Sequence, residues 1–297
     1  MRSKFTGCLL GVAIGDSLGM PVEGMSREKI LEKYGEIRDF LPSPDGFEAG
    51  EWTDDTEMTL ILCESLSSTI YFSPEDFSSR LRALESFRRY GPTTRRAVEL
   101  LKSGVHWKNS GIHSNTDGAA MRAAPIGLLY NFSLDLVENY ALISSSITHR
   151  GEGAIASAIS VSVAVACILN GRDPVKEAIR RSEAYDEFFA EKLRLAYELR
   201  KEDVEVALKE LGNSYLSYEA VPLAFYCHLS SESFEDAVLK AVNCGGDTDT
   251  IASITGALKG AEKGAEGIPE RLKRVKEKER IIETAERLYD AFLRITS

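Results

Sequence analysis

The stretch Cys244-Gly245-Gly246-Asp247-Thr248-Asp249-Thr250 opens an apolar segment that runs to Ala261. Ile251, Ile254 and Leu258 recur in it at helical spacing, which predicts a helix with one buried face. The polar cluster therefore belongs at the N-terminus of a core helix. The helix dipole favours one carboxylate there as a cap, but two buried carboxylates need further compensation. A hard divalent cation, Mg²⁺ or Mn²⁺, would supply it.

A second stretch, Trp52-Thr53-Asp54-Asp55-Thr56-Glu57, has the same character and again precedes apolar residues at helical spacing. Asp54, Asp55, Asp247 and Asp249 together carry four negative charges, which two divalent cations would neutralise. This balance predicts that the two stretches are halves of one dinuclear metal site. The alternative is two independent helix caps, since Asp and Thr are both preferred at that position.

Composition excludes several classes of function. The chain has 297 residues, 43% of them hydrophobic, which is enough to bury a sizeable core. A net charge of −10 argues against a non-specific nucleic-acid binder and against docking on an anionic membrane. A small molecule that carries phosphate stays possible, because local donors can hold it.

The cysteines and the N-terminus indicate a cytoplasmic location. Five cysteines lie scattered without metal-binding spacing, which predicts buried free thiols in a reducing compartment. Met1-Arg2-Ser3-Lys4 does not open a signal peptide. The most apolar segment, 154–169, reads as too short and too rich in serine to span a bilayer, so no membrane partner is expected.

Helical periods dominate the whole chain, and alternating strand-like patterns are scarce. With no internal repeat and no long linker, the pattern predicts one all-α domain over residues 1–297, a compact bundle of many helices. The first helix is expected to break within 15–19. Thr93 and Thr94 are expected to cap one helix, and another is expected over 116–129. The segment 154–169 is expected at the centre of the bundle because its small side chains allow close helix contacts.

Six stretches, taken together and in order, resemble the ADP-ribosylglycohydrolase family, which contains the dinitrogenase-reductase-activating glycohydrolases and ADP-ribosylarginine and ADP-ribosylserine hydrolases. The resemblance spans residues 7–261. The matching stretches are 11–19 with Glu23, 52–56, 90–94, 118–122 with Pro125, Thr148-His149, and 245–250.

The resemblance implies an all-α orthogonal bundle that holds two divalent cations, magnesium or manganese. Carried over position by position, it implies that one cation is bound by Thr53, Asp54 and Asp55, and the other by Asp247, Asp249 and Thr250. It further implies catalytic roles for Glu23, Asp55 and Asp249. ADP-ribose would be held by Gly91, Thr93, Ser114, Asn115, Asp117, Gly118 and His149.

The chemistry of such a site can be argued from the residues themselves. Cleavage of a glycosidic bond at ribose passes through an oxocarbenium-like centre. Two cations can orient a water molecule and lower its pKa, and Glu23 can act as general base or acid. The predicted function is therefore a metal-dependent hydrolase that removes ADP-ribose from a protein side chain or a small molecule. The chain is expected to be a monomer or a small homo-oligomer.

Two other functions stay open, together with simpler roles for single residues. One is an ADP-ribose-binding or crystallin-like protein on the same scaffold. The other is a glycosidase for another ribosyl compound, because Asp117 stands where the protein-directed members usually carry asparagine. Arg122 is expected to neutralise Asp117 or another buried carboxylate. Asp16 is expected either to hold the metal ligands in place or to end a helix, rather than to bind metal itself. Glu23 could instead be a plain loop residue, and His149 a capping or packing residue.

Overall fold

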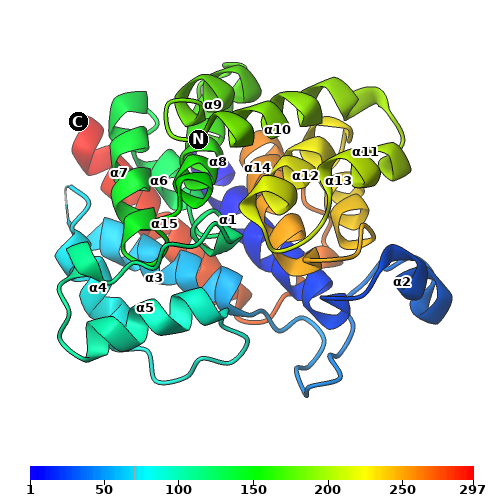
Figure 1. The fold of residues 1–297 in the computed structure, drawn as a ribbon, viewed down its shortest axis with the longest axis horizontal. Coiled ribbons are helices and arrows are strands. Elements are labelled where there is room, and N and C mark those ends of the chain that lie inside the picture. Colours follow the sequence, from blue (N-terminus) through cyan, green and yellow to red (C-terminus); the bar gives the residue numbers. More distant parts are fainter. Residues whose placement is uncertain (70) are drawn as a thin grey trace.

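Helices make up nearly all the regular structure of residues 1–69 and 71–297, which the computed structural model describes (Figure 1). The predicted all-α class is confirmed. The α-helices are α1 (Arg2–Gly19), α2 (Arg27–Tyr34), α3 (Asp54–Ser68), α4 (Pro74–Arg82), α5 (Pro92–Lys102), α6 (Ala124–Leu129), α7 (Leu134–Ser146), α8 (Glu152–Leu169), α9 (Pro174–Ser182), α10 (Glu187–Glu198), α11 (Val204–Leu211), α12 (Ser217–Leu229), α13 (Phe234–Val242), α14 (Thr248–Lys263) and α15 (Lys278–Thr296). Short 3₁₀ turns join them: η1 (Met20–Val22), η2 (Trp107–Asn109), η3 (Asp117–Ala119), η4 (Leu199–Lys201), η5 (Ala265–Gly267) and η6 (Leu272–Arg274).

The closest packing in the bundle joins α1 to α14, which cross the middle of the view in Figure 1. Four glycines, one per helical turn of α1, face small residues of α14. A Cβ atom built on Gly11 would lie 2.0 Å from the carbonyl oxygen of Gly256, and one on Gly256 would lie 2.1 Å from that of Gly11. The predicted break within 15–19 is wrong. The helix continues through Gly19 because these glycines allow the two backbones to touch.

Helix α8 is buried along almost its whole length and packs against α6, α7, α9 and α14. Its serine hydroxyls donate to backbone carbonyls, as Ser157 does to Ala154 and Ser162 to Ala123, so they need no water. The expectation that this segment is too short for a membrane span is wrong. Arg2–Val22 and Glu152–Leu169 both have the necessary length and apolar character, and 94% and 89% of their spans are buried inside the bundle.

Two other helix predictions need correction. The single helix expected over 116–129 is instead η3 followed by α6. Pro125 lies in the first turn of α6, where its missing N–H costs nothing, whereas one long helix would have placed it in the interior. Thr93 and Thr94 lie inside the first turn of α5 and do not cap it, because Gly91 is the N-cap residue.

Candidate active site

The N-termini of α3 and α14 open into the same cleft, which has a volume of about 440 Å³. The two acidic stretches, distant in the sequence, are thereby brought together. One carboxylate oxygen each from Asp16, Asp55 and Asp249 lies within 4.8 Å of the others, and the same holds for Glu23, Asp247 and Asp249. The cleft is lined by Glu23, Asp54, Asp55, Arg89, Gly91, Pro92, Thr93, Thr94, Thr116, Asp117, Gly118, Met121, His149, Tyr215, Asp247, Asp249 and Thr250.

The Gly245-Gly246 pair places the second acidic stretch and also holds the loop of Glu23. Both glycines have positive φ, 74° and 76°, and a Cβ atom on Gly246 would lie 2.0 Å from the carbonyl oxygen of Asn213. Gly246 donates its N–H to Met25 and accepts from the N–H of Gly24, both at 2.8 Å. Only glycine fits this turn, and the turn ties the start of α14 to the residues that follow Glu23.

Burial and mutual repulsion dominate the electrostatics of the cleft. The pKa values of Asp54, Asp55 and Asp249 are raised well above the usual range, first by desolvation and then by neighbouring carboxylates. Asp55 Oδ1 and Asp117 Oδ2 are buried and have no hydrogen-bond partner among the described residues. Hard oxygen donors with unused lone pairs and uncompensated negative charge match the ligands that Mg²⁺ and Mn²⁺ take.

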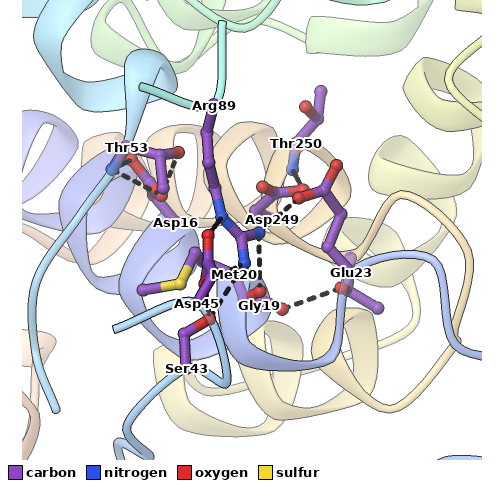
Figure 2. Close-up of polar contacts among 11 residues, drawn as sticks. Asp16, Gly19, Met20, Glu23, Ser43, Asp45, Thr53, Arg89, Asp249 and Thr250 are labelled. Atoms are coloured by element: carbon purple, nitrogen blue, oxygen red, sulfur yellow. Dashed lines mark hydrogen bonds and ion pairs between the residues drawn. The ribbon is translucent and has the colours of Figure 1, made fainter. Parts of the chain in front are cut away.

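Asp16 organises the start of α3 (Figure 2). Its carboxylate accepts hydrogen bonds from the backbone N–H and the hydroxyl of both Thr53 and Thr56, at 2.6–3.1 Å. Desolvation raises the pKa of Asp16, and these hydrogen bonds oppose the rise. The hydroxyl proton of Thr53 is thus directed at Asp16, which leaves its oxygen lone pairs for another partner.

Most of the residues predicted to bind ADP-ribose line the same cleft, namely Gly91, Thr93, Asp117, Gly118 and His149. Ser114 and Asn115 do not line it. The Ser114 hydroxyl accepts from that of Thr93 at 3.1 Å, and the Asn115 Oδ1 accepts from the N–H of Gly153 at 3.1 Å. These two residues therefore support the wall from behind.

His149 and Arg122 form a buried layer beneath that wall. His149 hydrogen-bonds with the hydroxyls of Thr116 at 3.0 Å and Thr148 at 2.8 Å, and burial lowers its pKa to about 3. Arg122 donates to the carbonyl of Gly118 and to the hydroxyl of Thr148, both at 2.7 Å, and to Ser144 at 3.1 Å.

The expected pairing of Arg122 with Asp117 is wrong. The guanidinium of Arg122 is directed at backbone carbonyls and a hydroxyl, where it locks η3 to the end of α7. Asp117 instead lies near the carboxyl of Asp247, and burial raises the pKa of Asp117 to about 8. The buried acid is thus held neutral by its surroundings and not by an arginine.

Six residues that line the cleft received no site role from the sequence: Arg89, Pro92, Thr94, Thr116, Met121 and Tyr215. Arg89 directly precedes the stretch 90–94, and this adjacency was its only signal. Tyr215 lies in the loop before α12 with 64% of its surface exposed, and its carbonyl accepts from the N–H of Asp117 at 3.2 Å. Nothing in the local pattern distinguishes it from an ordinary loop residue.

Comparison with known proteins agrees with this geometry. The family model described as ADP-ribosylglycohydrolase matches residues 1–296. An uncharacterised protein of Archaeoglobus fulgidus is 52% identical over 99% of both chains. The ADP-ribosylhydrolase ARH3 of Mus musculus is 28% identical, over 90% of this chain and 86% of its own. The ADP-ribosylarginine hydrolase Tri1 of Pseudomonas putida is 28% identical, over 96% of this chain and 77% of its own.

A solved structure supports the same assignment. It is titled an ADP-ribosylglycohydrolase-related protein complex and matches with a TM-score of 0.76 and 27% identity, over 100% of this chain and 99% of that one. The match of the family model over almost the whole length shows the family. The chain belongs to the ADP-ribosylglycohydrolase family, a family of hydrolases.

Proposed function

We propose that the chain hydrolyses the glycosidic bond between ADP-ribose and an acceptor, and that it does so with two divalent cations, Mg²⁺ or Mn²⁺. The observation that carries this proposal is the meeting of two acidic helix N-termini in one cleft. Carboxylates of Asp55 and Asp249 approach within 4.8 Å, with a buried oxygen of Asp55 left unpartnered. Buried like charges of this density must be neutralised by protons or by cations, and the unpartnered oxygen supports a cation.

The ligands in this proposal come from both helix N-termini. Thr53, Asp54 and Asp55 would hold one cation and Asp247, Asp249 and Thr250 the other. All of these residues line the cleft except Thr53, which is buried beside Asp16, and Asp249 belongs to both carboxylate clusters. When bound, such cations fix the ribose hydroxyls and lower the pKa of a water molecule. Asp16 would keep Thr53 in place through its hydrogen bonds.

The rest of the chemistry belongs to the chain's own residues. Glu23 lies at the edge of the cleft beside Asp247 and Asp249, where its carboxylate can take a proton from the attacking water or give one to the leaving group. The N-terminus of α5, which begins after Gly91, presents free N–H groups to the cleft. Such groups suit the oxygens of a diphosphate. His149, neutral and fixed by two hydroxyls, forms the floor beside them.

For the acceptor we propose a protein side chain. Support comes from the name of one relative, the ADP-ribosylarginine hydrolase Tri1. A cleft of about 440 Å³ that opens to solvent at Glu23 leaves room for an acceptor outside it. Arginine-linked and serine-linked ADP-ribose are therefore the first substrates to assay.

The decisive experiment compares wild type with Asp249→Ala. Wild type should release free ADP-ribose only when Mg²⁺ or Mn²⁺ is present, and EDTA should stop it. The variant should release none and should bind Mn²⁺ more weakly by calorimetry. If the variant cleaved at the wild-type rate, or wild type worked equally well in EDTA, the metal site would be wrongly assigned.

A second candidate is a glycosidase for another ribosyl compound, favoured by the carboxyl of Asp117 in the wall that would face a diphosphate. Measuring kcat/KM for each of a panel of arginine-, serine- and nucleotide-linked ribosyl compounds separates the two candidate functions. Tight ADP-ribose binding without turnover of any of these compounds would instead favour a binding protein on the same scaffold.

A further inference from the structure

Arg89 lies between two loops at the mouth of the cleft and uses all five of its N–H groups (Figure 2). Nε and Nη2 form a fork on the carboxylate of Asp45, at 3.0 and 2.8 Å, and Nη2 also donates to the hydroxyl of Ser43 at 2.9 Å. Nη1 donates to the carbonyl of Met20 at 3.0 Å and to Glu23 Oε2 at 2.6 Å. A guanidinium has five such donors, so this set is complete.

The backbone at Arg89 is also held in an unusual conformation. Its φ is 63°, a left-handed conformation that residues other than glycine seldom adopt. It lies between α4 and α5, in a segment that reaches the loops of Glu23 and Asp45. Only 18% of its side chain is exposed. A strained backbone combined with a fully bonded, largely buried side chain indicates a conformation held in place by its surroundings.

Glu23 needs such a partner. Its side chain is 42% exposed, and it extends from a short loop after η1 toward Asp247 and Asp249, with carboxylate oxygens of the three residues within 4.8 Å of one another. A side chain this exposed has several rotamers open to it, so a fixed direction needs a hydrogen-bonding partner. Arg89 supplies the only ion pair of Glu23 within residues 1–69 and 71–297.

We propose that Arg89 is the positioning residue of Glu23, and that Asp45 in turn fixes Arg89. This inference rests on the function proposed above, in which Glu23 moves the proton. The fork on Asp45 sets the plane of the guanidinium, and Nη1 then sets the direction of the Glu23 carboxylate. Lysine cannot replace it, because a single ammonium cannot reach both loops with this geometry.

The neighbouring Arg88 offers a matched control. It lies over the ring of Phe47, 3.4 Å from the centroid, and donates to the backbone carbonyl of Asp45 at 3.0 Å. It therefore anchors the same 43–47 loop but makes no ion pair with Glu23. Arg88→Ala removes anchorage of the loop alone, whereas Arg89→Lys and Arg89→Gly remove the geometry at Glu23. Arg89→Gly also relieves the positive φ, so a loss of activity in that variant cannot come from backbone strain.

The test measures kcat and KM of wild type, R89K, R89G, D45N and R88A on the ADP-ribosylated peptide that wild type cleaves best. It adds the Kd for ADP-ribose by calorimetry and hydrogen exchange of the amides of residues 22–25. We expect kcat to fall about 100-fold in R89K and R89G, as misplacement of a reacting group does, and less in D45N. In these variants KM and the Kd for ADP-ribose should change less than about threefold, and the amides of residues 22–25 should exchange hydrogen faster. R88A should keep at least about half of the wild-type kcat.

Three results would overturn the inference. One is a kcat in R89K equal to that of wild type. Another is an equal loss of kcat in R88A and R89G, which would mean that Arg89 only anchors the 43–47 loop. The third is a Kd for ADP-ribose raised more than about tenfold with kcat kept, which would make Arg89 a ligand contact. If wild type itself cleaved nothing, the proposed function would fail. In that case, an unchanged rate of amide hydrogen exchange at residues 22–25 in R89G would separately refute the inference that Arg89 positions Glu23.

Discussion

Replacing Asp117 by asparagine should make the metal-free protein more stable near neutral pH. Asp117 is buried, with one oxygen unpartnered among the described residues, and its pKa is raised to about 8. In the unfolded chain this carboxyl ionises near 3.8. As the pH rises from 4 toward 8, the unfolded state therefore loses a proton that the folded state keeps, and stability falls. Asparagine has no proton to lose, and its amide can donate to Asp247.

The size of the effect follows from the same values. At about 1.36 kcal/mol per pH unit, the interval from 3.8 to pH 7 corresponds to an upper value of about 4 kcal/mol. We expect D117N to raise the free energy of unfolding by about 2 kcal/mol at pH 7 and by less than about 0.5 kcal/mol at pH 4. Urea denaturation in EDTA at both pH values measures this, with the exposed Asp203→Asn as the control. A gain of equal size at both pH values, or a loss at pH 7, would refute the reasoning.

Three further changes probe the fold. Gly11→Ala should destabilise by about 3 kcal/mol in urea, although alanine favours helix by about 1 kcal/mol, because its Cβ would lie 2.0 Å from the carbonyl of Gly256. His228 is buried with its pKa lowered to about 3, so wild type should lose about 2 kcal/mol more than H228Q when the pH falls from 6.5 to 5. Arg122→Ala should lower stability by about 3 kcal/mol in the same assay, because it strips donors from the carbonyls of Gly118 and Ser144.

Local pattern predicted the helical class and the two acidic helix N-termini, because both depend on short-range signals. The meeting of the two acidic stretches was instead inferred from their charge balance and from the resemblance to a family. Apolar spacing marks the buried faces of α3 and α14, and Asp and Thr mark their N-termini. The errors arose where tertiary contact overrides propensity. Gly15 and Gly19 look like helix breakers in isolation, yet in the fold they let α1 touch α14. No property of the segment itself reveals that partner.

The finer points of the candidate site depended on contacts that a linear pattern cannot encode. Arg122 was expected to pair with a carboxylate because opposite charges attract. In the fold its guanidinium instead donates to the backbone carbonyls of Gly118 and Ser144. Arg89 had no pattern of its own, because its acceptors come from two distant segments of the chain, 20–23 and 43–45. The roles of the metal ligands stay predictions until a cation is measured.

The contact of α1 with α14 has a consequence for how the protein is made. Ser253 donates to the carbonyl of Val12 and Thr248 to that of Gly19, across 241 and 229 residues. A chain emerging from the ribosome thus exposes an apolar N-terminal helix long before its main neighbour has been translated. Pairing across such sequence distances is slow to form. Nascent chains should consequently depend on chaperones until the last quarter of the polypeptide is released, and C-terminal truncations should aggregate rather than fold in part.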